Sequence, residues 1–272
     1  RRHRKMVLKL FSLNVRGLNM PHRRQMLFKE AKKQRSVVLL IEETHFKKNC
    51  MPHRMLTVYP TPYHSIFTKK SRGVRLVVNS LSMFEHHETL NDPFGRYLLL
   101  QCIINNAQYM LVNIYGPHEG HHIFQDHILT LTNAHKFGEI LIGGDTNFIL
   151  DPTSDITSSS KISHKTTKQR AHSTALIENV LHIHGCLDIW RALHPLDKDY
   201  TYHSLVHDRY SRIDCFLLPS AQTSKISSAN IGIITWSDHA PITLSLTTQY
   251  PTSGNRTWRL NDSLLTDHKL HV

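Results

Sequence analysis

Short apolar runs separated by turn residues make up most of the chain, a pattern that is typical of β-strands. The separators include Ser-Arg-Gly, Asn-Asp-Pro-Phe-Gly and Asn-Asn. Two segments, 201–204 and 211–218, are predicted to form the arms of a hairpin whose loop contains His207, Asp208 and Arg209. Further strands are predicted at residues 6–15, 37–41, 66–68, 73–78, 97–104, 109–115 and 242–246.

Helical spacing of apolar residues occurs between some of these strands. Residues 21–33 interleave apolar and charged positions behind a proline, which is favoured in the first turn of a helix. Helices are also predicted at 122–137 and 173–184, whereas 151–170 is rich in Ser, Thr and Lys and is expected to be a mobile loop. This order of elements predicts an α/β protein with two packed sheets flanked by helices, in one domain.

The stretch at 139–150, Glu-Ile-Leu-Ile-Gly-Gly-Asp-Thr-Asn-Phe-Ile-Leu, is the one around which the chain is organised. An apolar strand leads into two glycines, which let the backbone approach a neighbour closely. Strand side chains repeat every second residue, so Asp145 and Asn147 are expected on one face. A carboxylate beside an amide donor suits a site that deprotonates water while binding an anion. An ordinary strand followed by an Asx turn is the alternative.

Polar side chains, mostly acids and amides, recur at or near the ends of the apolar runs. A sheet sandwich that gathers ligands at one rim needs such a series. Mg²⁺ takes oxygen ligands, only one or two of them carboxylates, and Glu43, Asn14 and an acid such as Asp238 fit that demand. His239 supplies a cation for phosphate oxygens if an acid raises its pKa, and Asp214 is the candidate partner. The series is Asn14, Glu43, Tyr115, Asp145, Asn147, Asp214 and Asp238-His239.

The charge balance favours a polyanionic partner. Lys and Arg number 33 against 21 Asp and Glu, a net charge of +12, and 22 His can add charge on mild acidification. The longest wholly apolar run, 37–41, is too short to span a bilayer, so no membrane partner is expected. No apolar stretch follows the basic residues 1–5, so no secretory signal is expected. Four widely spaced cysteines without a C-x-x-C pair indicate reduced thiols of an intracellular protein.

Six motifs occur in order along the chain. They are Ser12-Leu13-Asn14-Val15-Arg16-Gly17-Leu18-Asn19, Glu42-Glu43-Thr44-His45, Leu111-Val112-Asn113-Ile114-Tyr115, Gly143-Gly144-Asp145-Thr146-Asn147, Tyr210-Ser211-Arg212-Ile213-Asp214 and Ser237-Asp238-His239-Ala240-Pro241. Together they resemble the apurinic-type endonuclease domain of LINE-type (non-LTR) retrotransposon proteins, within the exonuclease–endonuclease–phosphatase superfamily. Residues 258–261 resemble the family's linker toward the reverse transcriptase.

The resemblance implies a four-layered α/β sandwich of the DNase I-like kind, with two mainly antiparallel sheets packed face to face and flanked by helices. It implies a basic arm at 1–6, an endonuclease domain at 7–248 and a linker at 249–272. The implied enzyme is nuclear, with cytoplasmic transit, and uses Mg²⁺, with Mn²⁺ as an alternative, to nick double-stranded DNA. The nick leaves a 3′-hydroxyl that primes a reverse transcriptase of the same polyprotein.

The same resemblance assigns catalytic roles. Asp145 would orient and deprotonate the attacking water, and Asn147 would position that water or the phosphate. Tyr115 would contact the phosphate, while His239, paired with Asp214, would stabilise charge on the phosphoryl oxygens.

The metal and DNA contacts follow in the same way. Glu43 would hold the metal with help from Asn14, and Asp238 would lie in the outer metal shell. A hairpin beginning near Thr201 would read groove shape more than base edges. The residues implied in DNA binding are Arg16, His118, Thr201, Ser204, His207, Arg209 and Arg212.

Three positions depart from the family pattern. Glu42 stands where Gln is usual, and the extra carboxylate is expected to raise the pKa of Glu43 or to bind a second ion. His118 replaces an Asn, and Thr146 replaces an aromatic residue, which leaves less bulk in the core. These departures motivate one alternative, a nucleic-acid-binding module with weakened catalysis. A superfamily phosphatase or phosphodiesterase acting on inositol phosphates or lipids is the other.

The sequence His118-Glu119-Gly120-His121-His122 satisfies the zinc-protease signature H-E-x-x-H. That chemistry needs both terminal His on one turn of a stable helix. Pro117 and Gly120 instead predict a loop or a helix start, so zinc is not expected here.

Overall fold

The protein is described by a computed structural model that covers residues 6–46, 62–67, 71–79, 83–157 and 164–248. The basic residues 1–5, the end of the predicted strand 66–68 and the predicted linker at 249–272 lie outside the described residues. None of the described helices combines the length and apolar character that crossing a bilayer requires.

Two six-stranded sheets form the body of the protein. The first sheet runs in the order β13 (Ile226–Ile231), β14 (Ile242–Thr248), β1 (Met6–Asn14), β2 (Val38–Glu42), β4 (Val74–Val78) and β3 (Pro62–Ser65). The second runs β5 (Phe84–Asn91), β6 (Tyr97–Ile104), β7 (Ala107–Tyr115), β8 (Glu139–Asp145), β12 (Asp214–Pro219) and β9 (Cys186–Asp188). Neighbouring strands are antiparallel except for β1 with β2 and β7 with β8.

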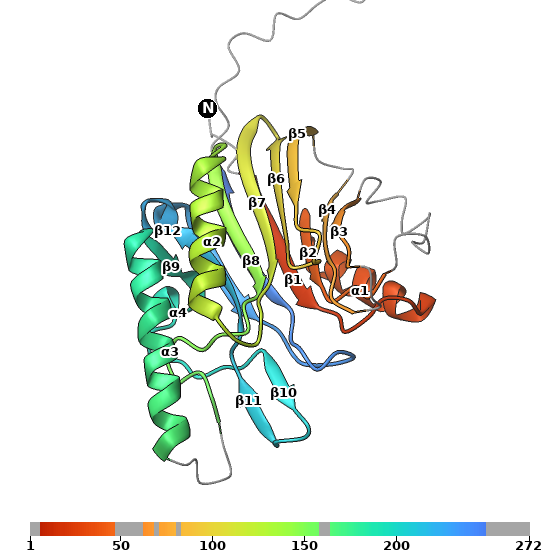
Figure 1. Ribbon diagram of the computed structural model, residues 1–272. Helices are drawn as coiled ribbons and strands as arrows, with labels where there is room; N and C mark the ends of the chain where they lie inside the picture. Colours follow the sequence, from red (N-terminus) through yellow and green to blue (C-terminus); the bar gives the residue numbers. More distant parts are fainter. Residues whose placement is uncertain (1–5, 47–61, 68–70, 80–82, 158–163, 249–272) are drawn as a thin grey trace, which may run out of the picture.

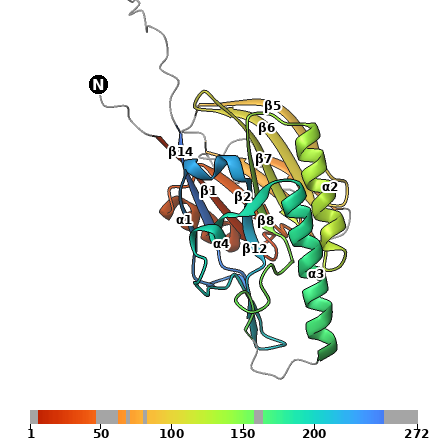
Figure 2. The same cartoon turned by 90° about the vertical axis from the view of Figure 1, so that its left-hand side faces the viewer.

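Helices cover the outer faces of both sheets, so the molecule has four layers (Figures 1 and 2). Helix α1 (Pro21–Lys33) lies against the first sheet, while α2 (His121–Ala134) and α3 (His164–Ile183) lie against the second. The short α4 (Ile189–Leu193) and a 3₁₀ turn at Ser220–Lys225 flank β12. The predicted four-layered sandwich is confirmed.

Three apolar clusters fill the spaces between the layers. Leu40, Leu100 and Leu141 belong to the cluster between the two sheets, where all three side chains are fully buried. Ile142 belongs to the cluster under α2 and α3, and Leu39 to the cluster under α1. Since successive residues of β2 and β8 face different buried layers, these strands are apolar on both faces.

Several predicted elements need correction. No strand covers Ile66 and Phe67, because β3 ends at Ser65. Helix α3 begins at His164, inside the segment predicted to be a loop. The hairpin pairs β10 (Tyr202–Ser204) with β11 (Arg209–Ser211), whereas β12, which was predicted to belong to the second arm, pairs with β8 in the second sheet.

Candidate active site

Three strand ends of the second sheet place polar side chains in one row. Tyr115 of β7 lies opposite Asp145 of β8, and Asp214 of β12 lies opposite Asp145 from the other side. In the first sheet, Asn14 lies opposite Glu42, so Glu43 follows directly at the same rim. The two sheets therefore bring polar groups from distant parts of the chain to one end of the sandwich.

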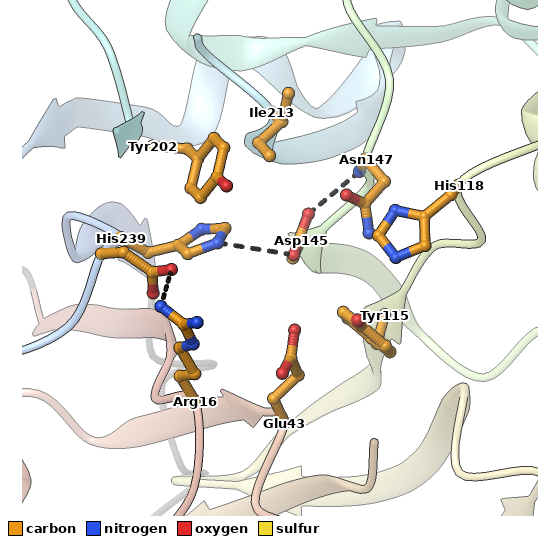
Figure 3. Close-up of a pocket in the computed structure, with 10 residues that line it drawn as sticks. Arg16, Glu43, Tyr115, His118, Asp145, Asn147, Tyr202, Ile213 and His239 are labelled. Carbon is orange, nitrogen blue, oxygen red and sulfur yellow. Dashed lines mark hydrogen bonds and ion pairs between the residues drawn. The ribbon is translucent and has the colours of Figure 1, made fainter. Parts of the chain in front are cut away.

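A cavity of about 380 Å³ lies between these strand ends (Figure 3). Eight of the ten residues that line it belong to the predicted site. The lining is formed by Arg16, Glu43, Tyr115, His118, Asp145, Asn147, Tyr202, Ile213, Asp238 and His239.

The glycines before Asp145 allow the close packing that forms this rim. A Cβ at Gly143 would lie 2.6 Å from the Phe216 ring and 2.9 Å from Leu40 of the opposite sheet. Gly144 has φ +136°, a conformation that side-chain-bearing residues rarely adopt. The predicted close backbone approach is confirmed.

Asp145 is buried at the end of β8 and faces polar partners. Its Oδ2 accepts a hydrogen bond of 2.9 Å from the Asn14 amide nitrogen and lies 3.9 Å from Nε2 of His239. Burial, reinforced by the neighbouring Asp214 carboxylate, raises the pKa of Asp145 to about 7, although His239 and Asn14 oppose the shift. The carboxyl group can therefore exchange a proton near neutral pH.

Asn147 shares the cavity with Asp145, but a turn rather than strand alternation places it there. Strand β8 ends at Asp145, and Asn147 has φ +56°. The Asn147 backbone N–H donates to Oδ1 of Asp145 at 3.0 Å, which is the Asx-turn contact, and its side chain donates to the Gly116 carbonyl. The Asx-turn alternative and the functional interpretation therefore describe the same geometry.

His239 and Asp214 form a buried pair. The His239 Nδ1–H donates to Oδ2 of Asp214 at 2.8 Å. Burial works to lower the pKa of His239, but the carboxylates of Asp214, Asp145 and Asp238 outweigh it and raise this pKa to about 10. The imidazole is therefore a cation at neutral pH.

Glu43 lies across the cavity from this pair. Its two oxygens contact the Asn14 amide nitrogen and Nε2 of His45, each at 3.0 Å, and the Tyr115 hydroxyl also bonds to it. Burial would raise the pKa of Glu43, but the bonds to His45, Asn14 and Tyr115 lower it to about 2. Glu43 is therefore an anion, and burial next to it raises the pKa of Tyr115, so that hydroxyl stays protonated.

Exposed basic side chains lie on two sides of the cavity. Arg16 donates to Asp238 at 2.9 Å, with 65% of the Arg16 side chain exposed. His118 is exposed in the loop before α2 and lies beside Asn147, across the cavity from Arg16 (Figure 3).

Comparisons with solved structures relate the fold of this chain to known proteins. No family model matches the chain. In solved structures, the chain is similar to the AP endonuclease LMAP of Leishmania major, with a TM-score of 0.75 and 15% identity over 89% of this chain and 88% of that one. An AP endonuclease of Archaeoglobus fulgidus gives a TM-score of 0.69 and 17% identity over 87% of this chain and 98% of that one. The fold is that of the apurinic-type (AP) endonucleases.

The chain is also similar in sequence to a protein of a transposon. The chain is 24% identical over 267 residues to the Transposon TX1 uncharacterized 149 kDa protein of Xenopus laevis, covering 96% of this chain. The chain spans 20% of the length of that protein. The predicted resemblance to the apurinic-type endonuclease domain of LINE-type proteins is confirmed by these two findings together.

Arg212 was predicted to bind DNA, but the structure places its side chain inside the protein. Its side chain is only 3% exposed and forms ion pairs with Asp155 at 2.8 Å and Asp188 at 2.5 Å. Its guanidinium also lies 5.1 Å from the centre of the Trp190 ring. All of its charge is used inside the protein, so Arg212 anchors the segment between the hairpin and β12.

Thr201 is also internal. It is fully buried, and its hydroxyl oxygen accepts hydrogen bonds from the backbone N–H groups of Ile213 and Asp214, each at 3.0 Å. Thr201 therefore fixes the backbone at Asp214, and its hydroxyl is already engaged inside the protein. Ser204 is buried at the end of β10, whereas His207 and, partly, Arg209 remain accessible on the hairpin.

Glu42 does not act on Glu43 as expected, because the pKa of Glu43 is lowered. Instead burial, followed by the Asp214 and Asp145 carboxylates, raises the pKa of Glu42 well above its usual value. Its Oε1 accepts a hydrogen bond of 3.1 Å from the Ser12 hydroxyl. A neutral carboxylic acid thus stands where the family has a neutral amide.

Thr146 replaces a bulky aromatic residue of the family pattern, and hydrogen bonds hold it in position. Its backbone N–H and its hydroxyl both donate to the Ile213 carbonyl, at 2.9 and 2.7 Å.

The zinc-protease signature is not assembled, since α2 begins at His121 after a left-handed Gly120 and His118 lies outside the helix. Within the described residues, the one acid–histidine cluster with metal-ligand spacing is Asp145, Asp214 and His239.

Sequence reasoning missed two lining residues, Tyr202 and Ile213. Ile213 lies inside a recognised motif but carries no polar group. Tyr202 follows Thr201, and its aromatic side chain in a predicted hairpin strand was the available signal.

Proposed function

We propose that this chain is a metal-dependent DNA endonuclease domain that nicks one strand and leaves a 3′-hydroxyl. The observation that carries the proposal is the convergence of Asp145, Glu43 and the His239–Asp214 pair around one cavity of an AP-endonuclease fold. An ionised carboxylate, a carboxyl group with a pKa near neutrality and a buried imidazolium form a complementary set for phosphodiester hydrolysis.

The residues present fit a divalent cation with a preference for oxygen ligands. The Asn14 amide nitrogen donates to both Glu43 and Asp145, so two carboxylates face the same small space. Glu43, helped by Asn14, would hold Mg²⁺ or Mn²⁺, with Asp238 in the outer shell. When bound, the cation supplies Lewis-acid polarisation of the phosphate and stabilises the leaving oxygen. The Asp145–Asp214–His239 cluster is less suited, because the protonated imidazole offers no lone pair.

The side chains then divide the hydrolysis among them. Asp145 accepts the proton of a water, whose oxygen attacks phosphorus, and Asn147 orients that water or the phosphate. The bond from phosphorus to O3′ breaks, and O3′ takes a proton to become the 3′-hydroxyl. His239, held by Asp214, stabilises negative charge on the phosphoryl oxygens, and Tyr115 contacts the phosphate.

The wider biology extends the same proposal. The similarity to a transposon protein supports a nick that primes reverse transcription by a reverse transcriptase of the same polyprotein, in the nucleus after cytoplasmic transit. The net charge of +12 supports double-stranded DNA as the partner, with Arg16, His118, His207 and Arg209 as the accessible contacts.

Conversion of supercoiled plasmid to nicked circles in the presence of Mg²⁺ tests the proposal. The wild-type protein should nick, and the new ends should be extended by a DNA polymerase without prior treatment. Asp145→Ala should lower the nicking rate by ~10²–10⁴-fold while DNA binding survives. Glu88→Ala, an exposed acid on β5, serves as the control and should leave nicking unchanged. A wild-type protein that binds but never nicks would instead support the binding-module alternative.

A further inference from the structure

Tyr202 forms part of the wall of the cavity but takes no part in the hydrolysis proposed above. It lies at the start of β10, and Figure 3 shows its ring entering the cavity with the hydroxyl turned toward Asp145. Tyr115 and Asn147 lie on the other side of Asp145 in the same view. Tyr202 is therefore a second tyrosine in the space where the scissile phosphate is proposed to bind.

The ring of Tyr202 is held against the catalytic histidine. The centres of the Tyr202 and His239 rings are 4.8 Å apart, and the two residues also form a backbone bridge. The backbone on either side is fixed as well, since the His203 N–H donates to the Asp238 carbonyl and the Ala240 N–H donates to the Thr201 carbonyl. The position of the Tyr202 ring is thus determined by the same loop that carries His239.

The hydroxyl groups of the two tyrosines differ in what they bind. The Tyr115 hydroxyl is bonded to the Glu43 carboxylate, so its proton is already engaged. Within the described part of the chain, no hydrogen bond to the Tyr202 hydroxyl is found, and this hydroxyl opens onto the cavity. A phenol can donate one hydrogen bond, and an anionic phosphate oxygen is a strong acceptor.

We propose that Tyr202 is a further catalytic residue, whose hydroxyl donates a hydrogen bond to an oxygen of the DNA phosphate bound beside Asp145. This inference rests on the proposed endonuclease function and deepens it. Because Tyr202 belongs to the hairpin, this contact joins the hairpin to the reacting phosphate. A hairpin that is correctly seated on DNA therefore brings one more donor to the phosphate.

Single-turnover nicking of a plasmid by Tyr202→Phe tests the proposal. This change removes the hydroxyl and keeps the ring that packs on His239. The expected result is a roughly 5- to 10-fold slower nicking step, as for the loss of one hydrogen bond. The thermal unfolding midpoint and the shape of the pH–rate profile should match those of the wild type, because the His239–Asp214 pair is untouched.

Tyr200→Phe is the matched control, since Tyr200 does not line the cavity and the change removes a hydroxyl while it leaves the ring, 6.0 Å from that of Tyr210. It should nick at the wild-type rate. If the wild type nicks and Tyr202→Phe nicks equally fast, the inference fails while the proposed function stands. If Tyr202→Phe and Tyr200→Phe slow nicking equally, the effect belongs to the hairpin and the inference also fails. If the wild type does not nick at all, both fail together.

Discussion

The Nδ1–H of His239 donates a hydrogen bond of 2.8 Å to Oδ2 of Asp214, and both side chains are almost wholly buried. Asp214 is the first residue of β12, whereas His239 lies in the segment that leads into β14. Their contact keeps a cation at the wall of the cavity, where burial alone would favour a neutral imidazole.

Asp214→Asn should therefore shift the alkaline limb of the pH–rate profile. In the wild type, the pKa of His239 is about 10, so its charge persists through pH 8 and 9. Without the carboxylate, burial lowers this pKa toward or below its ordinary range, and the cation is lost as pH rises past neutrality. Nicking rates measured from pH 6 to 10 should fall earlier in the variant. Superimposable profiles would contradict the role of the pair.

The same pair should affect stability in a defined pH window. The pKa of His239 is raised in the folded state, so its protonation stabilises the fold. This stabilisation is complete below the ordinary histidine pKa of about 6.5 and is lost as pH rises through about 10. The difference in unfolding free energy between the wild type and Asp214→Asn should therefore shrink between these values. Urea denaturation at pH 6, 8 and 10 measures it.

The acid limb of the pH–rate profile should reflect the titration of the Asp145 carboxyl group. Its pKa of about 7 means that the base is half protonated near neutrality, so nicking should rise with pH through that value. The Asn14 amide stabilises the ionised form, so Asn14→Ala should move this limb to higher pH when Mg²⁺ is saturating. An unshifted or downward-shifted limb would rule out this role for Asn14.

Removal of divalent cations should abolish nicking, and Mg²⁺ should restore it. Glu43→Gln keeps the shape of the side chain but removes the charge that would hold the cation. The variant should need a higher Mg²⁺ concentration, roughly tenfold or more, for half-maximal rate. Titration of Mg²⁺ with a fixed plasmid concentration measures this, and equal titration curves would exclude Glu43 as a ligand.

Two arginines that belong to different motifs should behave in opposite ways. Arg212→Met removes the ion-pair partner of buried Asp188 and leaves buried Asp155 with Arg191 alone, and it should cost about 3–5 kcal/mol of unfolding free energy. Arg16→Met, an exposed side chain, should change stability by less than about 0.5 kcal/mol and weaken salt-dependent DNA binding. Urea denaturation and binding at two salt concentrations separate the two effects. Weakened binding by a fully stable Arg212→Met would restore the original DNA-binding prediction.

Local patterns along the chain were enough for the central elements. Helix α1 and strand β6 have the predicted bounds, because the first follows a proline and the second is a continuous apolar run. Two edge strands were missed, since β5 is largely exposed, β13 is only partly buried, and both are defined by backbone pairing with β6 and β14. Such pairing leaves no periodic trace in the side chains.

The polar strand ends and the six motifs also indicated most of the cavity lining, since a residue at a strand terminus reaches the rim whatever its neighbours are. The partners and the protonation states of these residues depend on packing between distant segments. Arg212 and Thr201 are polar in sequence, but their partners lie in distant segments that meet only in the folded chain. These partners are Asp155, Asp188 and the backbone of Asp214. Protonation of Glu42 and His239 follows the same rule, because a pKa responds to burial and nearby charge, and both are properties of the assembled sheets.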